Sequence, residues 1–590
     1  MRIVATMLLS IILCGVTQVY PAIKLNPLYV KAQEYENQGE LDKAREIYEQ
    51  LYEAERTDIY FYKLINLYER TGDFTSIETL AGKRLVDRPG NTEAMRFLAR
   101  SYFGQGKREK AREILFSMVE KNWKDSNMVR LVANELFYQE EHDEAIQIFL
   151  TAREKQGDLQ LYAIEIARMY TFTRRFIPAI EEYLKVLDSI DVVYGNVALL
   201  INQALTEDYG FDEVSRPLAV YLEQHPASLN AARLLSDVRY RAGDYQGAHR
   251  VLMAPARTGQ NGSVFVWRLA EQLKNDRHHR EALAVYEDFY RYFPQASNRV
   301  QALMEAATLK TGLGETDSAR KDYETLIEDY SGTIHAEQAT LRLFRLMAED
   351  TNFDTFTKSL ETLATTTTYR EVAHEAYFLL GETFMRHDKL QEARRAFTSA
   401  KLKAKNNEEI HRVSVTAARL SFFTGEYELM NREIEESVRT LPDGEDINDL
   451  LAWKVLAMRC GSTGEADRLR LFARGQFDLY RGDNAAAIEA FLSAAQDTTS
   501  IVTAHAANTL GKLYREEGDF NRAMDWYLFA AKASPDTTLR VGALIEAADI
   551  AESELHSDQQ AKGLYFDAMT AYPGSVYESE LRDKLRRLVE

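Results

Sequence analysis

The sequence predicts an all-α fold, a solenoid of about 15 helix-turn-helix repeats, and two regularities indicate it. A column of mostly small residues recurs along the chain at a spacing close to 34 residues, and a bulky residue follows four places after most of its members. The column falls at Ala44, Ile77, Ala111, Ala145, Ala179, Val214, Ala248, Ala282, Ala319, Phe356, Ala393, Met430, Ala487, Ala523 and Ala561. Eleven of these fifteen residues are alanine, which predicts a close helix contact in nearly every repeat.

Each repeat is expected to contain two helices joined by a tight turn. The residue four places after a column position lies on the same helix face, and it is bulky at Tyr48, Leu115, Phe149, Tyr183, Leu252, Tyr286, Tyr323, Phe397, Phe491, Tyr527 and Tyr565. A small residue twelve places before the column marks the other helix, at Ala32, Ala99, Ala133, Ala167, Ala270, Ala307, Gly381, Gly475 and Gly511. The turn between them often contains glycine, which ends one helix and lets the chain reverse, at Gly39, Gly72, Gly243, Gly425, Gly482 and Gly518.

The stretch LGKLYREEGDFNRAMDWYLFAAKASP, residues 510–535, resembles the tetratricopeptide repeat, a helix-turn-helix unit of about 34 residues. The resemblance extends in phase over nearly the whole chain after residue 24, although the copies around Val214, Phe356 and Met430 lack the alanine. It implies a right-handed superhelix whose first helices line a concave groove. It also implies that the groove binds other proteins or peptides.

The spacing of the column suggests how the chain is divided. Intervals of 33 to 35 residues run from Ala44 to Ala282, intervals of 37 run from Ala282 to Met430, and 57 residues separate Met430 from Ala487. The surplus in the last interval, LPDGEDINDLLAWKVLAMRC, predicts a turn and one additional helix. We therefore expect a signal peptide at 1–22, a 34-residue-period array at 24–295, a 37-residue-period array at 296–440, an inserted helix at 441–465 and C-terminal repeats at 466–590.

The first residues have the order of an export signal. Arg2 precedes the apolar run IVATMLLSIIL, and the chain then becomes polar, so we expect cleavage after Ala22 and an exported, periplasmic protein. Two alternatives place it on the membrane through its N-terminus: an uncleaved anchor, or a lipoprotein modified at Cys14. If Cys14 is removed, Cys460 is the only cysteine, and no internal disulfide can form.

Linkers of the second half also favour an envelope location. The segments FPQASNRVQA, DYSGTIHAEQA and AYPGSVYESEL resemble linkers of bacterial envelope repeat proteins, such as the outer-membrane assembly lipoproteins and the Tol-Pal division coordinators.

Composition and motifs exclude several classes of function. The formal net charge of −19 argues against a nucleic-acid binder, whose phosphate contacts need a basic excess. The sequence contains no P-loop, HExxH, GxSxG or paired CxxC motif, and the repeats leave no segment of about 100 residues for a catalytic domain. We expect no enzymatic activity, no cofactor and no metal, and we interpret His278 and His279 as solvated turn residues.

One strip of side chains is a candidate binding surface. The residue after the small position of the first helix, and the one four places earlier, should point away from the second helix. In the first five repeats these places hold Tyr29, Gln33, Tyr62, Asn66, Arg96, Arg100, Arg130, Asn134, Ile164 and Arg168, with Phe103, Phe137, Tyr138 and Phe172 beside them. The corresponding second-half residues Thr308, Glu382, Gln476 and Lys512 show no basic trend.

This strip predicts a peptide-binding site. The candidate residues are Asn66, Arg96, Arg100, Phe103, Arg130, Asn134, Phe137, Tyr138 and Arg168. Arginine binds carboxylates at two points and stacks on aromatic rings, and asparagine can pair with a peptide backbone. The strip is similar to groove surfaces of tetratricopeptide proteins that clamp a peptide carboxylate, although the order of residues differs. An ordinary solvated helix face is the alternative. If the strip serves binding alone, changing Arg96, Arg100 and Arg130 to glutamate should barely change thermal stability.

The function that these features favour is a non-enzymatic protein-protein interaction scaffold of the bacterial cell envelope, binding partner proteins or extended peptides in its concave groove. A helical subunit that positions an envelope enzyme, such as one of a peptidoglycan-processing complex, is the alternative. Self-assembly through the solenoid ends is a third possibility.

Overall fold

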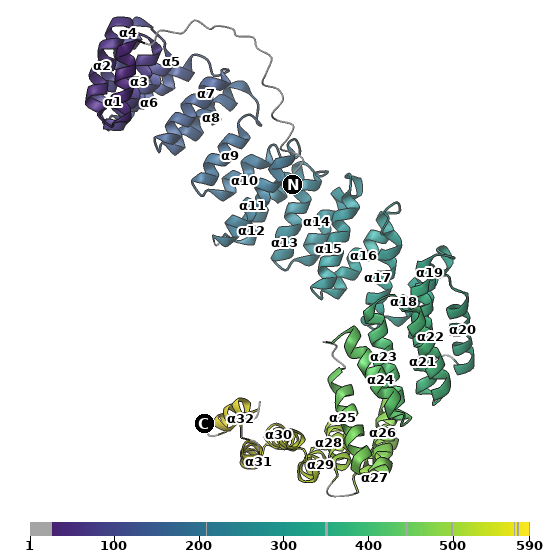
Figure 1. Ribbon diagram of the computed structural model, residues 1–590. Helices are drawn as coiled ribbons and strands as arrows, with labels where there is room; N and C mark the ends of the chain where they lie inside the picture. Colours follow the sequence, from purple (N-terminus) through teal and green to yellow (C-terminus); the bar gives the residue numbers. More distant parts are fainter. Residues whose placement is uncertain are drawn as a thin grey trace, which may run out of the picture. The chain divides into compact units, whose positions relative to one another are not determined.

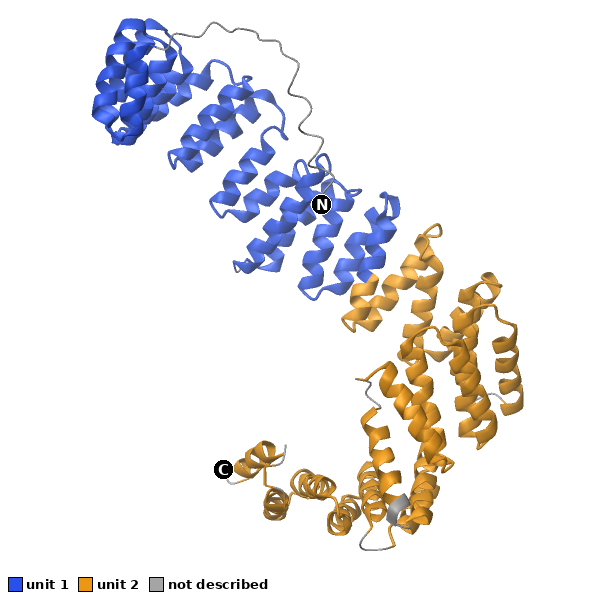
Figure 2. Ribbon diagram, viewed as in Figure 1, with its two compact units in different colours: residues 1–269 blue, residues 270–590 orange. Residues whose placement is uncertain are grey.

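The computed structural model describes residues 26–207, 209–348, 352–442, 447–463, 465–496, 500–571, 573–574 and 577–588. All regular structure in these ranges is helical: they contain 32 α-helices and no strand, so the predicted all-α solenoid fold is confirmed. The contacts divide the chain into two compact units, residues 1–269 and 270–590 (Figure 2). The predicted signal peptide and Cys14 lie outside the described residues.

Unit 1 contains the first fourteen helices and most of the fifteenth. They are α1 (Pro27–Asn37), α2 (Leu41–Glu55), α3 (Asp58–Thr71), α4 (Phe74–Asp87), α5 (Thr92–Gly104), α6 (Arg108–Glu120), α7 (Ser126–Tyr138), α8 (His142–Gln156), α9 (Ala163–Phe172), α10 (Phe176–Leu184), α11 (Asp191–Thr206), α12 (Phe211–Gln224), α13 (Leu229–Arg241), α14 (Tyr245–Thr258) and α15 (Gly262–Asn275). From α1 to α14, each helix packs against the next, so successive pairs lie side by side along this unit (Figure 1).

Unit 2 holds the remaining helices. They are α16 (His279–Tyr292), α17 (Arg299–Gly312), α18 (Thr316–Asp329), α19 (Ile334–Met347), α20 (Phe353–Thr366), α21 (Arg370–Arg386), α22 (Leu390–Lys403), α23 (Asn407–Phe423), α24 (Tyr427–Thr440), α25 (Ile447–Thr463), α26 (Ala466–Tyr480), α27 (Asn484–Ala494), α28 (Ile501–Glu516), α29 (Phe520–Ala533), α30 (Thr537–Ser553), α31 (Asp558–Ala571) and α32 (Glu578–Arg587). Counted over the described helices, fifteen pairs form, α1/α2 through α23/α24 and then α26/α27, α28/α29 and α30/α31. We call the earlier member of each pair its first helix and the later member its second helix.

The column of small residues lies in the core of every pair. All fifteen column residues are at most 3% exposed, including the larger Val214, Phe356 and Met430. Small residues on the first helices let the bulky residues of the second helices approach closely. At Gly381, for example, an added Cβ would lie 2.5 Å from the ring of Phe397, so only glycine fits there. The column therefore acts through packing, as its spacing predicted.

The Gly-Asp turns have a direct structural explanation. Gly518 has φ of +80°, a left-handed conformation that glycine adopts without steric cost. The next residue, Asp519, caps α29: its carboxylate accepts a hydrogen bond from the amide of Arg522 at 3.1 Å. Glycine thus reverses the chain, and aspartate starts the second helix.

An additional helix interrupts the series of pairs where the surplus residues predicted one. Helix α25 packs against α23, α24, α26 and α28 instead of pairing with one neighbour. The ring of Trp453 stacks on Phe422 of α23, with 4.5 Å between centroids, and Arg459 forms an ion pair of 3.2 Å with Asp536, the N-cap of α30. Helix α25 therefore joins elements that are distant in the sequence.

The two ways of dividing the chain describe different properties. Repeat spacing places a boundary near residue 295, whereas contacts separate the units within α15, between residues 269 and 270. The predicted change of array at 295 stays a prediction about superhelical pitch.

Candidate functional site

The nine predicted binding residues lie on four first helices of unit 1: α3, α5, α7 and α9. We call the outward side of these helices the first-helix surface of unit 1. The exposed members of the set are Asn66, Arg130, Asn134, Tyr138 and Arg168, and the partly buried members are Arg96, Arg100, Phe103 and Phe137. Successive first helices carry them, so the fold places these side chains in sequence along one unit.

Arg100 is held by carboxylates from both neighbouring first helices. Its Nε and Nη2 donate hydrogen bonds to Glu135 of α7 at 2.5 and 2.8 Å, and its Nη1 donates to Glu69 of α3 at 3.1 Å. Glu135 is only 3% exposed at its side chain, so this ion pair is largely removed from water. Burial by itself would lower the pKa of Arg100, but the two glutamates raise it above its ordinary value.

The other predicted arginines differ in how far they are engaged. Arg130 donates from Nε to Glu165 of α9 at 2.9 Å, thirty-five residues further on, and Arg96 pairs with Glu93 on its own helix. Arg168 is exposed and forms no ion pair or hydrogen bond with any residue in the described part of the chain. The strip is therefore largely a ladder of arginine-glutamate pairs between repeats, with little surplus positive charge.

Both asparagines remain available to a ligand. Asn66 and Asn134 are exposed, and their side chains make no hydrogen bond to a residue that the structure describes. The structure places them on α3 and α7, on either side of the Arg96 and Arg100 helix.

Exposed aromatic rings accompany the ladder. The side chain of Tyr138 is 76% exposed and that of Phe172 is 68% exposed. The guanidinium of Arg100 lies 5.5 Å from the Tyr138 ring centroid, and Phe172 contacts Phe137 edge to face at 5.0 Å. Phe103 packs onto the core, together with Phe137, so of the three predicted aromatic residues only Tyr138 presents most of its surface to solvent.

Sequence reasoning missed a group of charged residues on the first helices of unit 2. Arg345 of α19 and Arg412 of α23 both pair with Glu375 of α21. Burial raises the pKa of nearby Glu382, although the surrounding arginines favour its charged form, and burial lowers the pKa of Arg412. In the repeat of Phe356 the residue one place after the small position is Arg345, and in the repeat of Met430 it is Arg419. The basic residues of these two degenerate repeats were therefore visible in the sequence, but the prediction did not include them.

A buried histidine supports this group from beneath. His374, 1% exposed, has its Nδ1 2.8 Å from the carbonyl oxygen of Ala400, to which it donates. Its Nε2 then accepts a hydrogen bond from Arg412 Nη2 at 3.2 Å. Burial lowers the pKa of His374, which keeps the ring neutral and able to accept from arginine.

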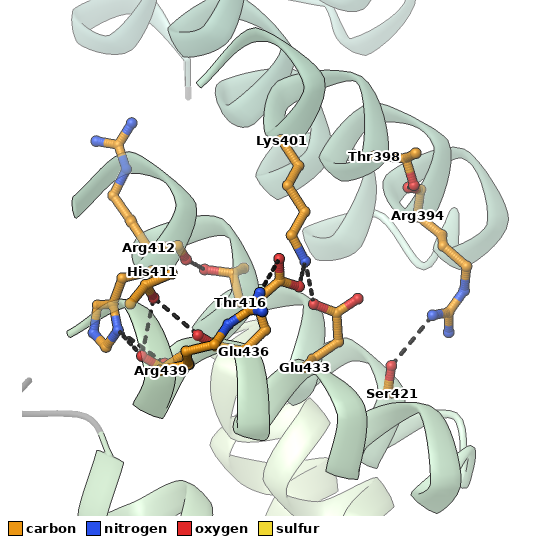
Figure 3. Close-up of polar contacts among 12 residues, drawn as sticks. Arg394, Thr398, Lys401, His411, Arg412, Thr416, Ser421, Glu433, Glu436 and Arg439 are labelled. Carbon is orange, nitrogen blue, oxygen red and sulfur yellow. Dashed lines mark hydrogen bonds and ion pairs between the residues drawn. The ribbon is translucent and has the colours of Figure 1, made fainter. Parts of the chain in front are cut away.

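Second helices of unit 2 are also joined by charge pairs. Figure 3 shows Lys401 of α22 reaching toward Glu433 and Glu436 of α24, with a distance of 2.8 Å to Glu433. On α23, the first helix of the same pair as α24, His411 lies 3.2 Å from the backbone oxygen of Ser437. The Lys401 contacts join adjacent repeats and the His411 contact joins the two helices of one repeat, and we assign all of them a structural role.

Each unit also has a surface cleft. In unit 1 a cleft of about 740 Å³ lies between the second helices α10 and α12, with Ile177, Pro217 and Tyr221 among its lining residues. In unit 2 a cleft of about 590 Å³ is lined by α25, α28 and α30, including Val455, His505 and Leu539. The described residues contain no group of three or more His, Cys, Asp or Glu side chains placed to hold a metal ion. Among the described helices, none has both the length and the apolar character needed to cross a bilayer.

Comparison with known families identifies the repeat type. Residues 227–420 match the model of the tetratricopeptide repeat-like domain, and residues 25–58 and 504–537 each match the tetratricopeptide repeat model. These three segments are therefore similar to tetratricopeptide repeats. The second of the short matches covers the whole stretch from Leu510 to Pro535, and the long match covers the degenerate repeat at Phe356.

Two solved structures match the chain over nearly its full length. The crystal structure of the APC/C hetero-tetramer Cut9-Hcn1 is 14% identical, with 95% of this chain and 96% of that chain covered and a TM-score of 0.24. The structure of Naa15/Naa10 bound to HypK-THB is 12% identical, with the same coverages and a TM-score of 0.27. No curated protein matches the chain in sequence.

Proposed function

We propose that the protein is a non-enzymatic scaffold that binds partner proteins, or extended peptides from them, on the first-helix surface of unit 1. The observation that carries the proposal is the exposure of Tyr138 and Phe172 on neighbouring first helices. Large aromatic side chains are costly to leave in water, and aromatic residues are enriched where proteins bind one another. The available amides of Asn66 and Asn134 supply hydrogen bonds for a peptide backbone beside these rings.

The paired arginines support the exposed aromatic ring and leave little charge for a ligand. Arg100 is fixed by Glu135 and Glu69, so it holds the Tyr138 ring by a cation-π contact and contributes little free charge to a ligand. Binding here would depend on aromatic contact and amide hydrogen bonding more than on the charge of Arg96 and Arg100. Arg168, which has no partner among the described residues, is the arginine of the strip best able to meet a carboxylate.

Changing both exposed aromatics to alanine should abolish capture of partner proteins without changing stability. The variant Tyr138→Ala/Phe172→Ala removes contact area that folding leaves exposed, so Tm should stay close to that of the wild type. Pulldown from envelope extract, read by mass spectrometry, measures the captured partners. The matched control is Val86→Ala/Leu402→Ala, which truncates residues 81% and 75% exposed on second helices. Equal capture by the aromatic variant and the control would contradict the proposal.

We also propose that the protein is exported to the bacterial cell envelope. The order of Arg2, the apolar run and the polar residues up to Ala22 supports this location, as do the three linkers of the second half. The mature N-terminus, measured by mass spectrometry of the natural protein, is expected at Ile23. A lipidated Cys14 would place the protein on the membrane, and a cytoplasmic protein that retains Met1 would refute export.

A further inference from the structure

One position in the series of arginine-glutamate pairs between repeats holds two arginines and no glutamate. Arg100 and Arg130 each pair with a glutamate thirty-five residues further along the chain, Glu135 and Glu165. Arg233 of α13 holds the same repeat position as Arg130, three places before the small position of its first helix. Thirty-five residues after Arg233 the sequence has Arg268 of α15. A positive charge therefore occupies the place that a glutamate holds in the other two pairs.

Two aromatic rings hold the guanidinium of Arg233. Its Cζ lies 4.2 Å from the ring centroid of Tyr194 of α11 and 3.7 Å from that of Phe265 of α15. Arg268 approaches the same Phe265 ring, at 6.0 Å. Stacking fixes the plane of the Arg233 side chain and leaves its N–H groups directed along that plane.

Within the described ranges, no carboxylate pairs with Arg233. Arg233 makes no hydrogen bond or ion pair with any residue in the described ranges. The acidic residue one turn further along α13, Asp237, pairs with Arg241 at 2.9 Å. Burial lowers the pKa of Arg233, and the charge of Arg268 adds to the effect. A partly buried charge normally has a partner of opposite charge, and Arg233 has none among the described residues.

Apolar side chains lie on the helices on both sides. Leu199 of α11 is 57% exposed and has the same repeat position as Arg233. Val264 of α15 is 50% exposed and lies one turn before Arg268, on the same helix face. A ligand that reaches Arg233 therefore finds exposed apolar surface nearby.

We infer that Arg233 and Arg268, with Tyr194 and Phe265, form a site that binds a carboxylate of a partner peptide, flanked by apolar residues of that peptide. The ligand would take the place that Glu165 occupies opposite Arg130, and the planar guanidinium would bind it through two N–H groups. The net charge of −19 repels acidic segments elsewhere, which makes a local surplus of arginine selective for them. This inference rests on the proposed scaffold function and adds a second, chemically distinct contact on another part of unit 1.

Fluorescence anisotropy with the full chain tests the site. The probe is a labelled peptide in which three glutamates alternate with leucine and glycine, with an amidated C-terminus. A glutamine version with an amidated C-terminus removes all carboxylates, and a glutamine version with a free C-terminus keeps only the terminal one. The glutamate peptide should bind at least about tenfold more tightly than the fully neutral peptide, and added salt should weaken it. If the free-acid glutamine peptide binds as well, the natural ligand is a C-terminal carboxylate instead of an acidic side chain.

The decisive variant is Arg268→Glu. It should recreate inside the protein the pair that Arg130 forms with Glu165, so binding of the glutamate peptide should fall by at least about tenfold while Tm is kept or raised. Arg233→Gln should give the same loss of binding. The control Arg239→Gln removes one positive charge from the same helix, at a residue 3.5 Å from Asp244, and should bind the peptide as the wild type does.

The peptide-binding measurements can contradict the Arg233 site without contradicting the proposed scaffold function. Wild-type affinity of Arg268→Glu, or equal binding of the glutamate and neutral peptides, would overturn the site. Displacement of the peptide by millimolar inorganic phosphate but not by acetate would overturn its assignment to a carboxylate. Capture of partners through Tyr138 and Phe172 is measured independently, so either result can fail without the other.

Discussion

Replacing Glu182 by glutamine is expected to lower the free energy of unfolding of unit 1 by about 3–5 kcal/mol, a cost typical of leaving one charge of a buried pair alone. Arg153 of α8 donates to both carboxylate oxygens of Glu182 of α10, at 3.0 and 2.6 Å. The two side chains are only 7% and 8% exposed. Glutamine cannot neutralise the guanidinium, and Lys185, 2.6 Å from Glu182, also loses its partner.

Hydrogen exchange measured by mass spectrometry, together with Tm, reports this loss, with the largest increase in exchange expected in α8 and α10. A control variant, Lys83→Gln, breaks a pair with Glu53 whose side chains are 55% and 54% exposed, and should cost less than about 1 kcal/mol. Replacing both buried charges, as Arg153→Met/Glu182→Leu, should recover most of the stability, because neither charge is then left unpaired. A Glu182→Gln variant as stable as Lys83→Gln would show that the pair contributes nothing to folding.

The second large effect is expected at Arg100. The substitution Arg100→Glu places a third carboxylate against Glu135 and Glu69, one of them buried, and should destabilise unit 1 by at least about 3 kcal/mol. Thermal denaturation of the full chain measures it. Arg168→Glu makes the same charge change at an exposed arginine with no partner among the described residues, and its Tm should match the wild type. Equal Tm values for the two variants would contradict a role of Arg100 in packing.

This result would depart from the sequence-based expectation that reversing the charges of Arg96, Arg100 and Arg130 leaves stability nearly unchanged. The expectation treats the outward positions of the first helices as separate from the packing face. In the structure, α7 brings Glu135 against Arg100 and buries it, so one side chain belongs to both surfaces. Spacing within a repeat predicts which face a residue lies on, but the pairing depends on the register between repeats.

The parts that sequence predicted well depend on local geometry. The column from Ala44 to Ala561 follows from the volume available between two helices, and the Gly518-Asp519 turn follows from backbone conformation and capping. The inserted segment was predicted from its surplus length, but its contacts with α23 and α28 could not be, because no repeat pattern specifies them.

The candidate site was harder to predict for the same reason. Arg345 falls in a copy that has lost its alanine, so the search for intact repeats passed over it. Arg233 belongs to the repeat of Ala248, which lies between the first five repeats and the second-half positions on which the prediction was based. The thirty-five-residue relation between Arg130 and Glu165 is visible in the sequence, but the structure is needed to know that these two positions meet.

Helix α25 has a consequence for how the C-terminal repeats lose their structure. In an array where each repeat touches only its neighbours, melting can begin at an end and advance one repeat at a time. Helix α25 contacts four helices, and its Arg459 holds Asp536, seventy-seven residues away. Melting that advances from α31 inward must therefore break the Arg459–Asp536 pair, and with it part of the support of α25, before it reaches α28. We therefore expect the inserted helix to make several repeats melt as one cooperative block, and we expect a partner that binds along α28 and α30 to meet a stiffer surface than a simple row of repeats.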